Sequence, residues 1–202
     1  MKLIYTLLDT TEYSDVERYI PLLPRYRRER IERARFEADK LLSLSAGLLI
    51  RSAAGDSQLV FNEHEKPYAK DSDIFFSVSH SGMCAAIAVD SAEVGLDVER
   101  IADRDYMSAA RRYYHPAEYA LVENSDDCLH AFYRIWTRKE AFLKREGTGI
   151  AARLNAFDST SKELSGHILS FELSDYAVSV CSAGTLSMDD IEISRVELKD
   201  LI

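Results

Sequence analysis

The chain has 202 residues, of which 47% are hydrophobic, 29% charged and 10% aromatic, so it can bury a core and is not a disordered segment. Its net charge of -9 argues against a general nucleic-acid binder, and we expect no nucleic-acid partner. This length predicts one large domain or two small ones.

Two features bear on where the protein works. The apolar run Leu3 to Leu8 is too short for a signal peptide or a membrane span, so it predicts a first strand and no membrane partner. The three cysteines, Cys84, Cys128 and Cys181, are odd in number, far apart and without metal-ligand spacing. Both features favour a cytoplasmic protein with reduced cysteines.

Two helical stretches are expected after the first strand. Ser14 and Glu17 form a capping-box pattern that predicts a short helix closed by Pro21 and Pro24. Residues 25–40 carry seven basic and four acidic side chains, which is typical either of a solvated helix face or of an anion-binding helix. Residues 39–53 are apolar on nearly every side and predict a buried helix.

Short strands dominate the next part of the chain. They are expected at residues 58–61, 74–78, 83–89 and 94–99. Residues 62–68 are expected to form a loop, in which Lys66 is extended because a proline follows it. The tight turns between the last three strands predict an antiparallel meander.

The last of these strands carries an acidic pair in the stretch Val94-Gly95-Leu96-Asp97-Val98-Glu99. Side chains alternate faces along a strand, so Asp97 and Glu99 point the same way. Two hard carboxylates on a rigid strand, with room for water and phosphate oxygens, suit Mg²⁺. The alternative is a strand end whose acidic residues simply face solvent.

The second half is expected to be helical first and then to return to strands. A short helix is predicted around residues 109–113, and Pro116 and Glu118 are typical of the first turn of another helix. A long helix is predicted over residues 129–146, ended by Gly147. Three strands complete the chain, at residues 167–173, 176–182 and 191–198.

One face of the long helix carries Trp136, Glu140 and Lys144, which are spaced by four residues. A third carboxylate and a lysine, combined with the acidic strand, are typical of a phosphoryl or phosphodiester transfer site. The same spacing is also common on salt-bridged helix surfaces, which is the alternative. A lone His80 in a turn is more often a hydrogen-bonded residue than a catalytic one.

Taken together, the motifs resemble those of the 4′-phosphopantetheinyl transferases, in particular the longer, surfactin-type (Sfp-like) class. That family has a Gly-(Ile/Val/Leu)-Asp-x-Glu strand and, further along, a Trp-(Ser/Thr)-x-Lys-Glu-Ala-x-x-Lys helix. This chain has Gly-Leu-Asp-Val-Glu at residues 95–99 and Trp-Thr-Arg-Lys-Glu-Ala-Phe-Leu-Lys at residues 136–144. Residues 76–81 match the family's Phe-x-x-Ser-His-Ser block, and Lys66-Pro67 matches its Gly-Lys-Pro block. The resemblance spans residues 25–150.

The resemblance implies an α+β fold of two similar α/β halves related by pseudo-twofold symmetry, each a small, mainly antiparallel sheet with helices packed on it. We place the halves at residues 1–100 and 101–202, and expect a monomer because one chain carries both. The implied reaction moves 4′-phosphopantetheine from coenzyme A to a serine of an apo acyl, peptidyl or aryl carrier protein. It requires Mg²⁺ and releases 3′,5′-ADP.

The resemblance also implies roles for individual residues. Asp97, Glu99 and Glu140 are expected to hold Mg²⁺, and Glu140 also to accept the proton of the carrier serine. Lys144 is expected to steady the phosphate under attack. The expected coenzyme A contacts, besides Lys144, are Arg28, Arg35, Lys66, Ser79 and His80. Of these, Arg28, Arg35 and His80 are expected at the 3′-phosphate.

Carrier docking is expected on the first helix after the acidic strand, through Arg111, Arg112 and Tyr113, although a solvated helix face is the alternative. Two departures from the family pattern predict weaker coenzyme A binding. Glu65 replaces the glycine of Gly-Lys-Pro, and Leu42 stands where many relatives carry an arginine. Two other functions stay open: a different Mg²⁺-dependent enzyme acting on a nucleotide diphosphate, and a non-catalytic coenzyme A or carrier-binding protein.

Overall fold

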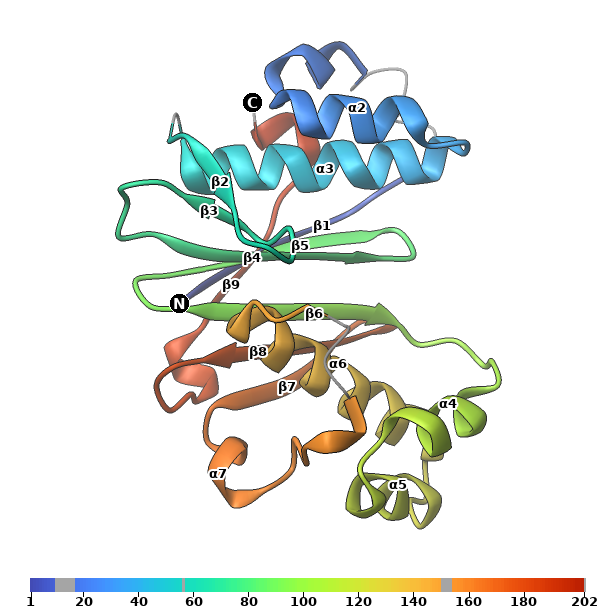
Figure 1. The fold of residues 1–202 in the computed structure, drawn as a ribbon. Helices are drawn as coiled ribbons and strands as arrows, with labels where there is room; N and C mark the ends of the chain where they lie inside the picture. Colours follow the sequence, from blue (N-terminus) through green and yellow to red (C-terminus); the bar gives the residue numbers. More distant parts are fainter. Residues whose placement is uncertain (10–16, 56, 150–153, 202) are drawn as a thin grey trace.

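A computed structural model describes residues 1–9, 17–55, 57–149 and 154–201, and Figure 1 shows its arrangement. The largest sheet has four strands in the order β4–β5–β1–β9, all antiparallel to their neighbours except β1 and β9, which are parallel. Its strands are β1 (Lys2–Leu7), β4 (Phe75–Ser81), β5 (Cys84–Asp90) and β9 (Glu192–Arg195). The first and last strands of the chain therefore lie side by side.

The second sheet has three antiparallel strands in the order β6–β8–β7. They are β6 (Val94–Arg100), β7 (Ile168–Leu173) and β8 (Tyr176–Ser182). The predicted three-strand meander is wrong in its last strand, because β6 pairs with β8 and not with β5. Strand β5 already pairs with β4 along one edge and with β1 along the other, so it has no free edge for β6.

A small antiparallel hairpin, β2 (Leu59–Phe61) and β3 (Pro67–Ala69), stands beside the larger sheet. The predicted loop over residues 62–68 is therefore shorter than expected, and only residues 62–66 form the tip of the hairpin. Pro67 is tolerated as the first residue of β3 because a proline costs no ladder hydrogen bond there.

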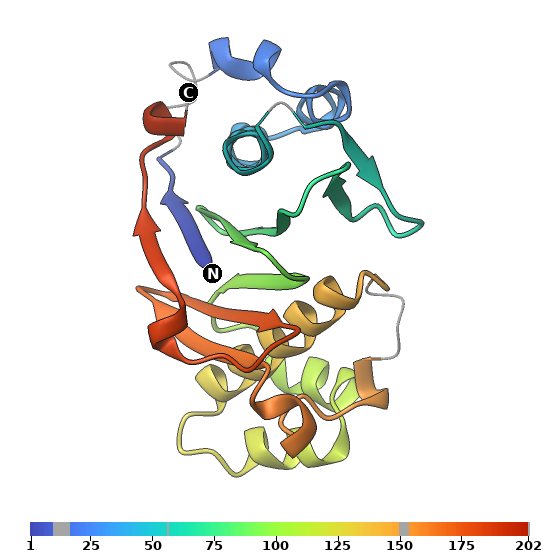
Figure 2. The same cartoon turned by 90° about the vertical axis from the view of Figure 1, so that its left-hand side faces the viewer.

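The larger sheet is covered by α3 (Glu37–Ala54), on which α2 (Arg25–Arg33) packs, and Figure 2 shows α3 end-on above the sheet. The prediction of a buried helix is confirmed, since α3 packs on Leu23 and Ile31 on one side and on Phe76 and Ile87 on the other. The basic stretch is broken between α2 and α3. The capping box expected at Ser14 lies outside the described residues.

The helices of the second half are α4 (Tyr106–Tyr113), α5 (Pro116–Glu123), α6 (Cys128–Glu146) and α7 (Lys162–Ser165). Helix α6 packs on the smaller sheet and α7 on its strand β7, while α4 and α5 pack on α6. The long helix is confirmed as α6, which begins after the Asp127 cap and ends at Gly147 with φ 68°. Pro116 is the first residue of α5, as predicted, and His115 and Glu118 form its capping box.

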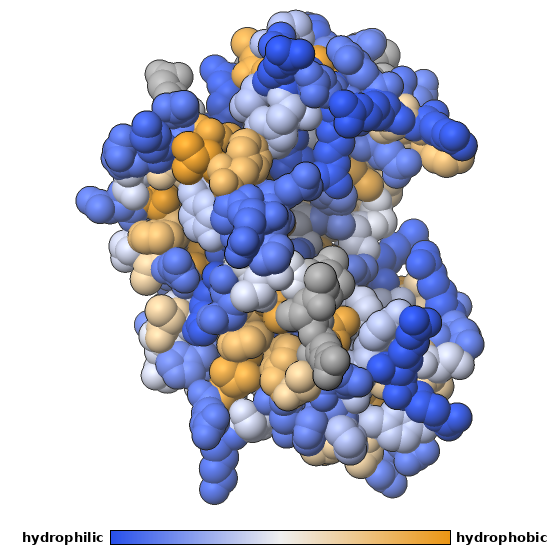
Figure 3. Space-filling view, in the orientation of Figure 1, coloured by the Kyte–Doolittle hydropathy of each residue, from blue (hydrophilic) through white to orange (hydrophobic). Residues whose placement is uncertain are grey.

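The fold is α+β, as expected. The boundary at residue 100 stays a prediction: β6 pairs with strands that follow it, while β9 joins the sheet of the first half. The strand expected at residues 191–198 is shorter, and Leu198, in a 3₁₀ helix (Leu198–Leu201), packs into the core beside α3. No helix in the described residues is long and apolar enough to cross a membrane. Figure 3 shows a largely hydrophilic surface with scattered apolar patches.

Candidate active site

Strand β6 presents its two acidic side chains toward β4 and α6. Leu96 and Val98 point into the core and are fully buried, so the predicted alternation holds. Asp97, on the opposite face, is also buried, with 3% of its surface exposed. A carboxylate this deep requires compensating hydrogen bonds or charges, because burial alone disfavours its ionised form.

Gly95 lets α6 approach β6 closely enough to meet these acids. A Cβ on Gly95 would lie 1.9 Å from the Ala141 carbonyl oxygen and 2.5 Å from the Arg145 amide nitrogen. Both neighbours are backbone atoms of α6, so no side-chain rotation could relieve the clash. The glycine before the acidic pair is therefore required by packing.

Three serines on β4 form hydrogen bonds with β6, in addition to the backbone pairing of β6 with β8. Ser77, Ser79 and Ser81 accept from the amides of Leu96, Val98 and Arg100 at 3.0, 3.3 and 3.1 Å. In addition, the Ser79 hydroxyl donates to Asp97 Oδ1 at 2.9 Å and the Ser81 hydroxyl to Glu99 Oε2 at 2.6 Å. Sequence reasoning missed Ser77 and Ser81, although their alternation with Ser79 indicates one face of a strand.

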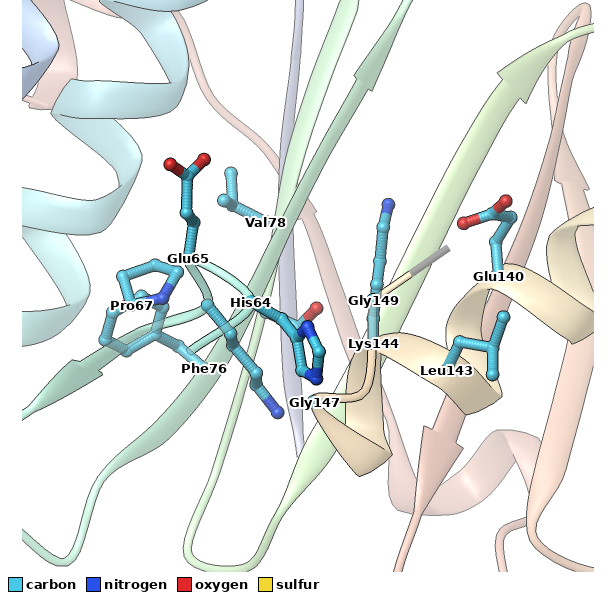
Figure 4. A pocket seen from close by; sticks show the side chains of 12 residues that line it. His64, Glu65, Pro67, Phe76, Val78, Glu140, Leu143, Lys144, Gly147 and Gly149 are labelled. Atoms are coloured by element: carbon cyan, nitrogen blue, oxygen red, sulfur yellow. The ribbon is translucent and has the colours of Figure 1, made fainter. Parts of the chain in front are cut away.

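Helix α6 contributes Glu140 and Lys144, which Figure 4 shows side by side on the wall of a pocket. The Lys144 ammonium donates to Asp97 Oδ1 at 2.6 Å and to the Ser79 hydroxyl at 2.9 Å. Burial raises the pKa of Glu140 to about 7, with the charges of Asp97 and Glu99 adding to the shift and Lys144 opposing it. The predicted acids and lysine thus meet in one electrostatically coupled cluster.

The donor set suits a hard cation. Burial and the charge of Asp97 raise the pKa of Glu99, and Asp97 Oδ2 is buried without a hydrogen-bond partner in the described part of the chain. A cation would offset the mutual repulsion and engage the orphaned oxygen. Among the described residues, no group of three or more His, Cys, Asp or Glu is arranged to hold a metal by itself. Mg²⁺, however, ordinarily takes only one or two carboxylates and completes its shell with water and substrate phosphates.

A cavity of about 300 Å³ opens beside this cluster. Glu140, Leu143 and Lys144 line one wall, and Figure 4 shows Glu65 and Pro67 across the opening. Its remaining lining residues are His64, Lys66, Phe76, Ser77, Val78, Gly147 and Gly149. The mixture of apolar walls with a few charged groups is typical of a small-molecule site.

A second cavity, of about 290 Å³, lies around His80. Arg30, Arg33, Asp39 and Ser43 are among the residues that line it, and the Ser43 hydroxyl is buried without a hydrogen-bond partner among the described residues. Burial and then the charges of Arg30, Arg27 and Lys144 lower the pKa of His80 to about 4. Two arginines against one acid, with an unpartnered hydroxyl, make the cavity suitable for an anion.

The predicted basic residues Arg28 and Arg35 are exposed and, in the chain as described, do not line either cavity. Sequence reasoning missed Arg30 and Arg33, which line one cavity with His80. Their spacing of three residues is the signal that could have been used, since such residues share a helix face.

Comparison with known proteins agrees with the geometry of this site. The family described as the 4′-phosphopantetheinyl transferase superfamily matches residues 93–194, which include β6 and α6. A 4′-phosphopantetheinyl transferase of Bacillus subtilis is 30% identical over 197 residues, which cover 85% of this chain and 87% of the relative. The chain belongs to the 4′-phosphopantetheinyl transferase superfamily.

Two further transferases support the assignment. Sfp of Bacillus subtilis strain 168 is 30% identical over 184 residues, covering 86% of this chain and 80% of Sfp. AcpT of Salmonella typhimurium is 36% identical over 146 residues, covering 70% of each chain. The resemblance found in the sequence is therefore confirmed.

The two departures from the transferase pattern both lie at the cavities. Glu65 has φ 63°, the left-handed conformation that favours glycine, so the backbone keeps a glycine-like path despite the substitution. Leu42 lines the His80 cavity and contributes an apolar wall there.

On the transferase surface, α4 exposes Arg111 and Arg112. Arg111 donates to the Tyr119 hydroxyl at 3.3 Å, while Tyr113 packs edge-on against Trp136. Trp136 thus packs between α6 and α4. The carrier contacts expected on α4 stay a prediction.

Proposed function

We propose that the protein transfers the 4′-phosphopantetheine group from coenzyme A to a serine of an apo acyl, peptidyl or aryl carrier protein, releasing 3′,5′-ADP. The observation that carries the proposal is the cluster of Asp97, Glu99, Glu140 and Lys144 at the wall of a cavity, in a chain that matches this family over most of its length. A non-catalytic binding protein would have no need of buried, mutually repelling carboxylates beside a lysine.

Mg²⁺ fits the oxygen donors of this cluster, and we propose that Asp97, Glu99 and Glu140 hold it, one or two of them directly and the rest through water. When bound, it would neutralise charge on the pyrophosphate of coenzyme A and polarise the phosphorus under attack. The orphaned Asp97 Oδ2 supports this assignment.

The remaining chemistry falls to the protein's own side chains. The carrier serine oxygen forms a bond to the phosphorus that bears the pantetheine arm, and the bond from that phosphorus to the bridging oxygen breaks, so that 3′,5′-ADP leaves. Glu140, directly or through a water, accepts the serine proton. Lys144 offsets the negative charge that grows on the phosphate oxygens. Its bond to Asp97 keeps the ammonium oriented before substrate arrives.

We propose that the 3′-phosphate of coenzyme A binds in the His80 cavity. The buried Ser43 hydroxyl, together with Arg30 and Arg33 of the cavity wall, supports this placement. Ser79 has its hydroxyl engaged by Asp97 and Lys144, so its proposed contact with the nucleotide phosphates passes through that cluster. The roles predicted for Arg28 and Arg35 stay predictions, and Arg30 and Arg33 are the stronger candidates because they line the cavity.

The proposal also includes a docking surface for the carrier, a monomeric state and a location in the cytoplasm. The carrier protein docks near Arg111, Arg112 and Tyr113, where exposed cations face solvent. The enzyme acts as a monomer, since a single chain supplies both the acidic strand and the catalytic helix. The free thiols of Cys84, Cys128 and Cys181 suit the reducing cytoplasm.

The decisive experiment is the intact mass of an apo carrier protein after incubation with this enzyme, coenzyme A and Mg²⁺. We expect a gain of one phosphopantetheine group, lost in Glu140→Gln and in a chelated sample and retained in the exposed control Glu163→Gln. No gain with several carrier types, while coenzyme A still binds, would instead indicate a binding protein. Hydrolysis of coenzyme A without carrier modification would indicate a different Mg²⁺-dependent enzyme.

A further inference from the structure

The tip of the β2–β3 hairpin lies against the carboxyl-terminal end of α6. The Asn62 side-chain amide donates to the Gly147 carbonyl at 2.7 Å, and the Lys66 ammonium donates to the Arg145 carbonyl at 3.0 Å. Lys66 also reaches the Val94 carbonyl, at the start of β6, at 3.5 Å. Two residues of one short loop thus bind backbone acceptors about 80 residues further along the chain.

These contacts supply hydrogen-bond donors to carbonyls at the end of α6. The last four carbonyls of a helix have no partner within it, and the end carries a partial negative charge that a cation stabilises. At the end of α6 the Gly147 amide donates to Leu143 at 2.9 Å, which leaves the carbonyls beyond Leu143 to other donors. Asn62 and Lys66 are those donors for Gly147 and Arg145.

The fit between hairpin and helix is close. A Cβ on Gly147 would lie 2.9 Å from Asn62 Nδ2 and 2.9 Å from the Tyr68 hydroxyl, and its φ of 68° already favours glycine. The tip is also ordered by bonds within itself, because Asn62 Oδ1 accepts from the amides of His64 and Lys66, each at 2.9 Å. A strained residue completes it: Glu65 adopts φ 63°. Such strain persists only where the surroundings enforce it.

Resemblance alone assigned Lys66 to the nucleotide, but its ammonium is engaged elsewhere. It is partly buried, and burial lowers its pKa, while its hydrogen bonds go to the carbonyls of α6 and β6. Lys144 immediately precedes Arg145, whose carbonyl Lys66 holds. A shift of this last turn would move the Lys144 ammonium away from Asp97, 2.6 Å distant.

We propose that Asn62 and Lys66 are positioning residues, which act through the end of α6 to hold Lys144 and Glu140 against β6. This inference rests on the proposed function, since it concerns the geometry of the same reaction. Both residues also belong to the hairpin that borders the larger cavity, so substrate bound there contacts the loop that orients the catalytic helix.

The test uses single variants of the whole enzyme. Asn62→Asp keeps the oxygen that accepts from the loop amides but replaces the donor to Gly147 with an oxygen. Lys66→Met removes the ammonium and keeps a stem of similar length. Lys70→Met makes the same change on an exposed lysine just after β3 and is the matched control. Each variant is measured for kcat and KM in carrier modification, and for amide hydrogen exchange in the last turn of α6.

We expect Asn62→Asp and Lys66→Met to lower kcat at least tenfold with KM for coenzyme A changed less than about threefold, because a misplaced group loses transition-state stabilisation. Exchange in the last turn of α6 should be faster in both, and Lys70→Met should match the wild type. A raised KM with wild-type kcat and exchange in Lys66→Met would instead place the ammonium on the nucleotide and overturn the inference.

Failure of the proposed function would look different. In that case the wild-type enzyme itself modifies no carrier, while hydrogen exchange still reports on the contacts. Wild-type exchange in both Asn62→Asp and Lys66→Met would refute the hairpin's hold on α6, whatever the activity.

Discussion

The contact between Gly95 and α6 makes Gly95→Ala the most informative single substitution in this enzyme. The added methyl group would lie 1.9 Å from the Ala141 carbonyl oxygen, whereas ordinary van der Waals contact begins at 3.4 Å. The shortfall of 1.5 Å (3.4 minus 1.9) must be met by moving β6 or α6, because the obstructing atoms are backbone.

The expected cost follows from that displacement. Overpacking a core typically costs about 1–3 kcal/mol and sometimes more, and we expect about 3 kcal/mol here because no side chain can yield. For a chain of this size, that corresponds to a fall in Tm of about 6–12 °C. Because α6 carries Glu140 and Lys144 while β6 carries Asp97, a displacement of about 1 Å should also lower kcat/KM about 100-fold.

Thermal unfolding and carrier modification together provide the assay. Gly184→Ala is the matched control, since the added methyl group would meet no atom of the described residues within 4 Å other than those of its chain neighbours. We expect its stability to stay within about 0.5 kcal/mol of the wild type. If Gly95→Ala had the Tm and kcat/KM of the wild type, the close approach of α6 to β6 would be refuted, together with the explanation of the glycine in this motif.

Three further substitutions test other parts of the site and its scaffold. Arg30→Ala should raise KM for coenzyme A about 10–100-fold but leave dephospho-coenzyme A unaffected, because a charged hydrogen bond contributes about 1.5–3 kcal/mol; the reverse pattern, with Arg28→Ala as the damaging change, would restore the assignment made from resemblance. His80 has a folded pKa of about 4, below the ordinary value of about 6.5, so the unfolded chain takes up its proton first and stability falls as the pH drops through this window. Between pH 7 and pH 5, the free energy of unfolding measured in urea should therefore fall by up to about 2 kcal/mol less in His80→Gln than in the wild type. An equal fall in both proteins would contradict burial of a neutral imidazole. Lys139 and Glu118 form a buried ion pair with 1% and 0% of their side chains exposed. Lys139→Met should lower the free energy of unfolding in urea by about 3–5 kcal/mol, because it leaves the buried Glu118 charge without its partner. Adding Glu118→Gln to that variant should recover part of the loss, and an additive further loss would count against the pairing.

Much of the candidate site could be predicted from the sequence because its geometry is local. Alternation along a strand put Asp97 and Glu99 on one face, and a spacing of four put Glu140 and Lys144 on one side of α6. Gly147 marked the end of that helix, because helices often end at a residue in the left-handed conformation and glycine adopts it readily. Backbone periodicity extends over only a few residues, and these features require no more than that.

The pairing of strands could not be obtained in this way. Strand β6 reads as the third member of a meander, yet it pairs with β8 because β1 occupies the second edge of β5. The four-strand sheet is completed by β9, from the far end of the chain. Such pairings depend on which edges remain free after the whole chain has folded.

Tertiary structure also decided which polar groups serve which purpose. The sequence by itself showed which arginines, serines and lysine could form hydrogen bonds in the site. It could not show their partners, which lie far away along the chain. Only the folded chain turns Arg30 rather than Arg28 toward His80, and engages Ser79 with Asp97 and Lys66 with the end of α6. The reason is that a buried polar group must form hydrogen bonds with the groups beside it. Which groups are buried, and which lie beside them, is decided only when the core has assembled.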